Sequence, residues 1–166
     1  MKRIAALALL TLLFNAPTVA MTGRASYISD GDTLWVRPSD GGKPIKLRLH
    51  GLDAPEVCQA GGVASRDALK RLVDQRSLQV ETFGRDAWGR TIARISIDRH
   101  DLGARLVQDG HAWSDRFRDD PGPYAVEETA ARRSRRGVFA QTKPERPRDF
   151  RLRHGPCEVQ ASGLSR

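Results

Sequence analysis

Short apolar runs separated by turn residues dominate the first half of the chain. In residues 45–49, Ile45, Leu47 and Leu49 alternate with Lys46 and Arg48, which predicts a strand with one buried face and one cationic face. The turn-rich segment 38–42 joins it to a strand predicted over residues 34–37. By the same reasoning, further strands are predicted over residues 25–29, 78–83 and 91–97.

Helical spacing follows the strands. Residues 63–75 carry an apolar stripe, and Asp101 can cap a short helix that ends at Gly110. A later helix is predicted over residues 124–136, with Gly137 placed to end it, and residues 51–62 are predicted to form a long loop. The order of strands, helix, strands and two helices favours an α+β domain with a small antiparallel barrel.

The first twenty residues have the layout of a secretory signal peptide. Lys2 and Arg3 precede an apolar run over residues 4–14, and the segment ends in small residues at Ala20. The run is shorter than the roughly 20 residues that a membrane-spanning helix needs, which disfavours the alternative of an uncleaved anchor. We expect cleavage after Ala20, an exported protein that is periplasmic or secreted, and no stable membrane association afterwards.

The rest of the chain is enough for one domain, predicted over residues 21–142 and followed by a basic tail. The tail, residues 143–166, is rich in proline and arginine between residues 143 and 154, and it is expected to be ordered or half-ordered. The formal charge of the whole chain is +8, and it stays at +6 without Lys2 and Arg3. A basic surface suits a polyanionic partner, although a role in solubility alone is the alternative.

The chain contains two cysteines, Cys58 and Cys157. In an exported protein an even number of cysteines favours a disulfide, and only one pairing is available here. The alternative is two free thiols. A zinc site is not indicated, because the four histidines have no ligand-like spacing with the cysteines.

Acidic residues gather where predicted strands end. Asp30 and Asp32 lie on a tight turn, and Asp53 and Glu56 lie on a proline-stiffened loop. Carboxylates on separate loops, with backbone carbonyls nearby, suit a hard cation that prefers oxygen ligands. The Asp-Gly turn by itself is better explained as ordinary turn chemistry.

Two arginines strengthen the case for a catalytic site. Arg48 lies on the polar face of its strand, and Arg90 lies at the entry to another strand. A guanidinium can donate two parallel hydrogen bonds to phosphate oxygens and stabilise negative charge in a transition state. Glu56 could then act as a general base on water, as phosphodiester hydrolysis requires. Either arginine alone is better explained by a surface salt bridge.

These motifs, in this order and spacing, resemble the signature blocks of the staphylococcal nuclease (thermonuclease) family. The resemblance extends over about residues 25–139, and residues 147–151 also resemble a tail segment of many bacterial members. The blocks that carry it are Asp30-Gly31-Asp32-Thr33, Arg48-Leu49, Gly51-Leu52-Asp53-Ala54-Pro55-Glu56, Trp88-Gly89-Arg90 and Leu106-Val107-Gln108-Asp109-Gly110.

The resemblance implies a five-stranded OB-fold β-barrel with three α-helices, and a protein that acts as a monomer. It also implies a Ca²⁺ site formed by the Asp32 and Asp53 carboxylates and the backbone carbonyl of Ala54, with Asp30 behind the ligands. The expected activity is calcium-dependent hydrolysis of DNA and RNA with little sequence preference. Family members expel the 5′ oxygen and leave 3′-phosphate ends.

By the same resemblance, Glu56 would activate the attacking water, while Arg48 and Arg90 would hold the scissile phosphate. Trp88 replaces a tyrosine of the founding member and is predicted to contact a base or ribose, with packing at the barrel rim as the alternative.

Two further positions differ in the expected nucleoside pocket. Arg116 and Arg118 stand where the founding member has two tyrosines, so we predict that they attract phosphate.

A rival function is a non-catalytic nucleic-acid-binding module on an OB barrel. Such a module would have no need to keep the acidic residues and the arginines together, so the combined set favours a nuclease. An exported structural or adhesion domain would account for the basic charge but for none of the site.

Overall fold

The computed structural model describes residues 21–155 and 157 of the chain. The predicted signal peptide with its cleavage point after Ala20, and the end of the tail from residue 158, lie outside the described residues. Across the described ranges, no helix has the length and apolar character needed to cross a membrane.

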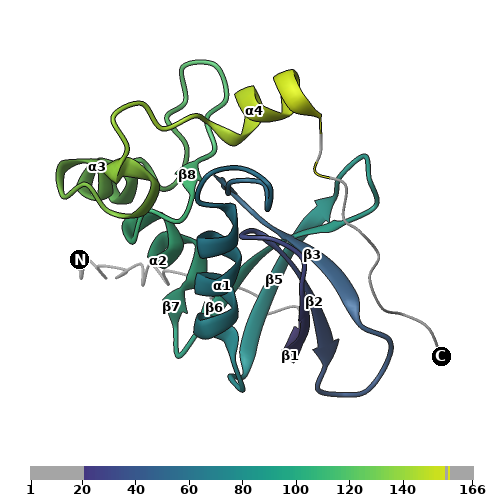
Figure 1. Cartoon of the computed structure of the whole chain (residues 1–166). Coiled ribbons are helices and arrows are strands. Elements are labelled where there is room, and N and C mark those ends of the chain that lie inside the picture. Colours follow the sequence, from purple (N-terminus) through teal and green to yellow (C-terminus); the bar gives the residue numbers. More distant parts are fainter. Residues whose placement is uncertain (1–20, 156, 158–166) are drawn as a thin grey trace, which may run out of the picture.

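Five strands form a closed barrel (Figure 1). Each strand pairs antiparallel with its neighbours except at the closure, where β3 and β6 run parallel. The predicted OB-fold α+β class is therefore confirmed, but the barrel is mixed because of this one parallel pair. The strands are β1 (Met21–Ile28), β2 (Thr33–Pro38), β3 (Ile45–Leu49), β5 (Leu78–Arg85) and β6 (Thr91–Ile97).

The alternating pattern of β3 places its residues as predicted. Leu47 and Leu49 are buried in the core, together with Leu34 and Val36 of β2. Since successive side chains of a strand point to opposite faces, Arg48 is excluded from the apolar interior. The same alternation that builds the core therefore presents Arg48 at the outer surface of the barrel.

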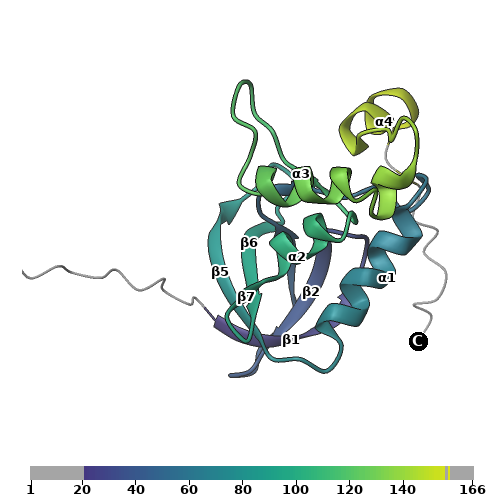
Figure 2. The same cartoon turned by 90° about the vertical axis from the view of Figure 1, so that its left-hand side faces the viewer.

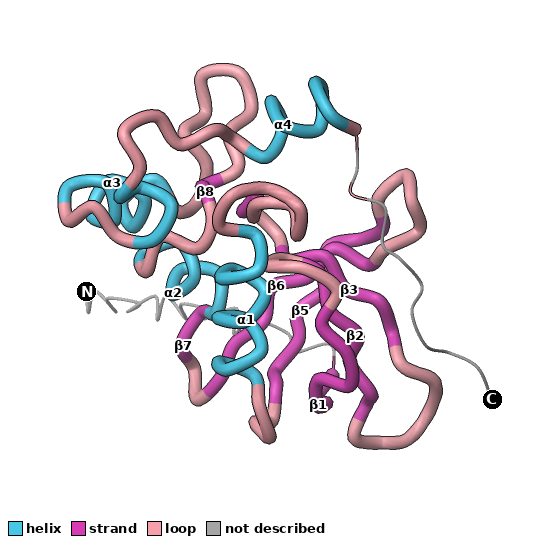
Figure 3. Tube along the Cα trace, viewed as in Figure 1, coloured by secondary structure: helices cyan, strands magenta, loops and turns pink. Residues whose placement is uncertain are grey.

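Helices cover one side and one end of the barrel (Figures 2 and 3). Asp101 caps α2 as predicted, since its side chain accepts a hydrogen bond from the amide of Ala104. The third helix is shorter than predicted, and the residues after it include Arg135 and Gly137 with positive φ, which ends the helical geometry. The helices are α1 (Gly62–Val73), α2 (Leu102–Gln108), α3 (Ala125–Arg133), the 3₁₀ helix η1 (Gly137–Ala140) and α4 (Pro147–His154).

Helix α4 adds a fourth helix to the three that were expected, and it lies in the segment predicted to be a tail. Pro147 occupies its first turn, where a missing N–H costs nothing. In Figures 1 and 2 the helix lies at the end of the molecule where the N-terminus of α1 also lies.

Three short strands complete the fold. The predicted loop 51–62 contains β4 (Leu52–Asp53), which pairs antiparallel with β8 (Trp113–Ser114), while β7 (His100–Asp101) extends the sheet beside β6. Glu128 of α3 is buried and anchors β8, because its carboxylate accepts a hydrogen bond from the amide of Ser114 at 2.9 Å. The β4–β8 pair thereby fixes the start of the acidic loop against the helices.

We predict that Glu128→Ala lowers the free energy of unfolding by about 2 kcal/mol or more, because it leaves the buried Ser114 amide without an acceptor. Urea denaturation followed by circular dichroism measures the change. The neighbouring Glu127→Ala is the control, and it should cost less than about 1 kcal/mol as a first-turn acidic residue. Equal effects of the two variants would contradict the anchoring role.

Candidate active site

Arg48 joins the two acidic segments that were singled out in the sequence. Its Nη1 forms an ion pair with Asp32 Oδ1, and its Nη2 lies 2.9 Å from Asp53 Oδ1. Asp32 is further held by the amide of Ala54, which donates to Oδ2 at 2.9 Å. Asp30 lies behind this group, where its Oδ1 accepts a hydrogen bond from the Asp32 amide at 3.0 Å. The structure therefore brings the predicted ligand residues together at one place.

Burial and charge act against each other in this group. Burial raises the pKa of the Asp32 carboxyl, and the positive charge of Arg48 opposes that rise. Burial likewise opposes the charged form of Arg48, but Asp32 and Asp53 hold the pKa of Arg48 above its usual value. The guanidinium is therefore the charge that makes a buried acidic pair tolerable.

The arrangement suits a hard divalent cation. Both carboxylates approach the same guanidinium, so carboxylate oxygens from two segments converge. No group of three or more acidic, histidine or cysteine side chains with metal-binding geometry occurs in residues 21–155 and 157. A bound cation would therefore take two carboxylates, and backbone and solvent oxygens would complete its coordination.

Arg90 lies at the edge of the same site. Its Nε lies 2.7 Å from Asp86 Oδ2, and its Nη1 donates to Thr33 Oγ1 at 3.5 Å, while Thr33 in turn donates to Asp32. Although burial acts in the opposite direction, the hydrogen bonds from Arg90 lower the pKa of Asp86. Trp88 is 80 % exposed and lies beside the Arg90 guanidinium, so it is not packed into the barrel. Its contact with substrate stays a prediction.

Glu56 lies next to Asp53, and an arginine that was not among the predicted site residues connects them. Arg151 of α4 has Nη1 2.9 Å from Glu56 Oε1 and 3.1 Å from Asp53 Oδ1, and its Nη2 is 3.1 Å from Asp53 Oδ2. The only pointer in the sequence was the resemblance of residues 147–151 to a tail segment. The separation of 98 positions between Arg151 and Asp53 hides their contact from local patterns.

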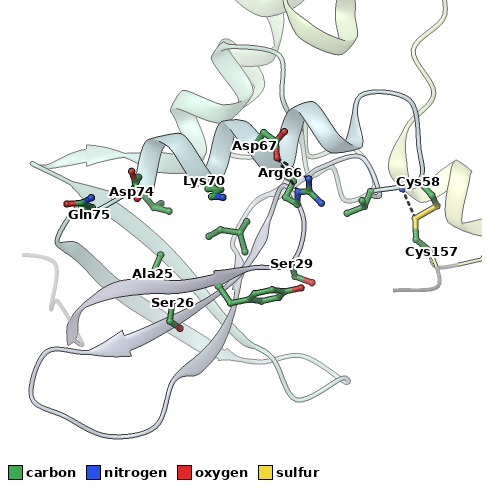
Figure 4. A pocket seen from close by; sticks show the side chains of 14 residues that line it. Ala25, Ser26, Ser29, Cys58, Arg66, Asp67, Lys70, Asp74, Gln75 and Cys157 are labelled. Atoms are coloured by element: carbon green, nitrogen blue, oxygen red, sulfur yellow. Dashed lines mark hydrogen bonds and ion pairs between the residues drawn. A yellow bond between two sulfur atoms is a disulfide. The ribbon is translucent and has the colours of Figure 1, made fainter. Parts of the chain in front are cut away.

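The tail is attached to the acidic loop at two further points. Cys58 and Cys157 form a disulfide, the pairing favoured from the sequence (Figure 4). In addition, Gln59 Nε2 donates to the backbone oxygen of Glu145 at 2.8 Å. These links flank α4 and bring it beside the candidate active site.

Arg116 and Arg118 lie in the loop after β8 and have different surroundings. Arg116 forms an ion pair with Glu128 at 3.0 Å and lines a pocket of about 390 Å³ that adjoins Arg48 and Asp53. Arg118 is not among the lining residues, and its guanidinium lies over Phe117. A substrate role remains a prediction for both arginines.

A larger hollow of about 730 Å³ lies between α1 and β1 (Figure 4). Its lining includes Tyr27, Lys70 and the disulfide, but none of the predicted catalytic or metal-binding residues. Size alone therefore does not locate the chemistry, and the charged cluster around Arg48 does.

Comparisons with known proteins identify the family of the chain. Residues 46–141 match the family described as "Staphylococcal nuclease homologue". The chain belongs to the staphylococcal nuclease family. It is 33 % identical over 146 residues to an "Uncharacterized endonuclease" of Haemophilus influenzae, which covers 87 % of this chain and 81 % of that protein.

Two other relatives are a bacterial protein and a plant protein. An "Uncharacterized endonuclease" of Escherichia coli O157:H7 is 32 % identical over 149 residues, covering 87 % of this chain and 95 % of its own. The "Probable staphylococcal-like nuclease CAN2" of Oryza sativa is 32 % identical over 109 residues, or 66 % of this chain and 30 % of that longer protein. The bacterial matches extend over most of both chains.

We predict that Arg48→Ala lowers the free energy of unfolding by about 3 kcal/mol, because it leaves the buried Asp32 carboxylate uncompensated. Denaturation in urea at neutral pH without added metal measures this loss. Lys46→Ala on the same strand is the matched control and should change stability by no more than about 0.5 kcal/mol. An Arg48→Ala protein as stable as the wild type would contradict the pairing.

Proposed function

We propose that this protein is an exported, calcium-dependent nuclease that hydrolyses DNA and RNA phosphodiesters with little sequence preference and leaves 3′-phosphate ends. The convergence of Asp32, Asp53 and Glu56 with Arg48 at one end of the barrel carries this proposal. The family membership and the endonuclease names of the two bacterial relatives support it.

The arginines would bind the scissile phosphate. Arg48 of β3 and Arg90, in the turn just before β6, both approach the Asp32–Thr33 segment, so a phosphodiester there would meet donors from two directions. Guanidinium groups can donate paired hydrogen bonds to phosphate oxygens, and these bonds strengthen as negative charge develops in the transition state. Calcium bound at Asp32 and Asp53 would supply additional positive charge for the same purpose.

Glu56 would serve as the general base. Its carboxylate removes a proton from a water molecule, the water oxygen forms a bond to phosphorus, and the bond from phosphorus to the 5′ oxygen breaks. The departing 5′ oxygen takes a proton from solvent and becomes a 5′-hydroxyl end, while the proton held on Glu56 is released to solvent, so that the carboxylate is restored. Because Glu56 is only partly buried, solvent can reach it to complete this exchange.

Export is supported by two features of the chain. The layout of residues 1–20 is typical of a signal peptide, and disulfides such as Cys58–Cys157 persist in oxidising compartments. Calcium is plentiful outside the cytosol, where weak, open oxygen sites suffice. We therefore place the monomeric enzyme in the periplasm or the external medium.

We predict that Glu56→Gln lowers the rate of DNA cleavage by about 10²- to 10⁴-fold, since the amide cannot take the proton from water. Gel assays on single- and double-stranded DNA with calcium measure the rate. Glu81→Gln is the control, because Glu81 pairs with Arg94 on the barrel and lies outside the site. Wild-type protein that binds DNA but does not cleave it, whichever metal is added, would instead support the non-catalytic binding module.

We also predict that calcium raises the melting temperature of the wild-type protein and that a chelator reverses the rise, because a ligand that binds only the folded state stabilises it. Asp53→Asn should abolish most of this increase. Asp109→Asn, on an acidic residue that pairs with Arg105 at the end of α2, should retain it. An unchanged response in Asp53→Asn would exclude Asp53 as a ligand.

A further inference from the structure

Arg151 reaches the candidate active site from outside the barrel and family-matched region. Its guanidinium spans the two carboxylates of Asp53 and Glu56 through three contacts of 2.9 to 3.1 Å. The match to the family ends at residue 141, whereas α4 begins at Pro147. Arg151 is thus a third arginine at the site, beside Arg48 and Arg90. Because it lies outside the matched domain, the family match does not assign it a role.

The contacts of Arg151 conflict with a cation at the same carboxylates. Both Asp53 oxygens accept hydrogen bonds from Arg151, and Oδ1 also accepts one from Arg48. A divalent cation bound at Asp32 and Asp53 would compete for these oxygens and would repel the guanidinium. Cation binding therefore favours a state in which Arg151 gives up at least part of its bonding to Asp53.

A displaced Arg151 would have an anionic partner close by once substrate is present. The pocket between α4 and β8 is lined by Arg48, Asp53 and Arg151, so the groups that bind cation and phosphate share one space. A phosphodiester brought there would offer oxygens that suit the planar guanidinium. The side chain of Arg151 is about one-third exposed, so these donors are accessible to a ligand.

We propose that Arg151 is a phosphate-binding residue of the nuclease. Before calcium and substrate bind, its guanidinium is hydrogen-bonded to Asp53 and Glu56. When they bind, it transfers these hydrogen bonds to the substrate phosphate. This inference rests on the proposed function. It makes Arg151 both a competitor of calcium and a contributor to substrate binding.

The disulfide helps to hold Arg151 at the site. Only Pro147 of α4 is buried, so apolar packing contributes little to holding the helix. The Cys58–Cys157 bond instead ties Cys157, three residues after the end of α4, to the loop that carries Glu56. Opening the disulfide should loosen α4, because the Arg151 contacts and the Gln59–Glu145 hydrogen bond are then the links that hold it beside the site.

The first experiment separates calcium binding from catalysis in Arg151→Gln. Isothermal titration with calcium alone, without DNA, should show a dissociation constant lower than that of wild type by about fivefold or more, because a competing positive charge is gone. Cleavage assays at saturating calcium should show a KM for DNA that is higher by about tenfold. Arg151→Lys should recover part of the KM, since it keeps the charge but loses the planar pair of donors.

The matched control is Arg153→Gln on the same helix, because the exposed Arg153 side chain pairs with Glu145 and touches neither Asp53 nor Glu56. It should leave both the calcium affinity and the KM unchanged. If Arg151→Gln weakened calcium binding, Arg151 would only support the acidic loop and the proposal would be wrong. If Arg151→Gln tightened calcium binding but left the KM unchanged or lowered it, Arg151 would be an inhibitory contact alone, which also overturns the proposal.

The second experiment tests the tether. The double variant Cys58→Ser with Cys157→Ser should show part of the tighter calcium binding and of the higher KM that Arg151→Gln shows, since α4 is less firmly held. Adding Arg151→Gln to it should therefore produce a smaller further change than the same substitution produces in the wild type. If the effect of Arg151→Gln persisted in full without the disulfide, the tether would have no part in placing Arg151.

These outcomes can be told apart from failure of the proposed function. Wild-type protein that neither binds calcium nor cleaves nucleic acid would overturn the nuclease proposal itself. Wild-type protein that does both, with calcium affinity and KM unchanged in Arg151→Gln, would overturn only the role of Arg151.

Discussion

The ion pairs of Arg48 with Asp32 and Asp53 are the interaction on which the site depends. Asp32 is only 1 % exposed, and moving an isolated carboxylate out of water costs several kcal/mol. Arg48 offsets this cost and at the same time joins the turn after β1 to the loop after β3. Without this bridge, the two acidic segments would repel each other.

The barrel places Arg48 where this bridge can form. Within β3, Arg48 is paired with Thr33 of β2 on one side and with Ile92 of β6 on the other. The parallel β3–β6 pair closes the barrel, so Arg48 lies at the seam where three strands meet. Leu47 and Leu49 fix its direction, because a shift of one residue would bury the charge and expose both leucines. Core packing therefore determines the geometry of the site.

Local sequence patterns predicted the strands whose ends are set by alternating residues and flanking turns. The strands over residues 45–49 and 91–97 match the structure at both ends, because alternating residues and flanking turns define them. The strand β1 begins at Met21, earlier than predicted, since Thr22 and Gly23 carry no strand pattern and pair with the distant β5. The two-residue strand β4 is too short to show any period.

The candidate site likewise contains residues that local sequence patterns predict and one residue that they do not. Asp32, Arg48 and Asp53 could be found from the sequence because strand ends and turns place them, and the structure brings them together. Arg151 could not be found, since it is one arginine in a tail that contains several. Its partners Asp53 and Glu56 are almost a hundred positions away. Only the closed fold, with the tail bonded to the acidic loop, identifies it.

Helix α4 shows how a basic segment with little apolar surface can still have a defined position. An eight-residue helix is marginal by itself in water, and Leu152 on α4 is 78 % exposed. Its position therefore depends on polar and covalent links, namely the Arg151 ion pairs, the Gln59–Glu145 hydrogen bond and the disulfide. Each of these links ends on the loop that carries Asp53 and Glu56. The order of this loop and the order of the tail are thus coupled, and oxidising conditions, which preserve the Cys58–Cys157 bond, also help to keep an arginine at the candidate active site.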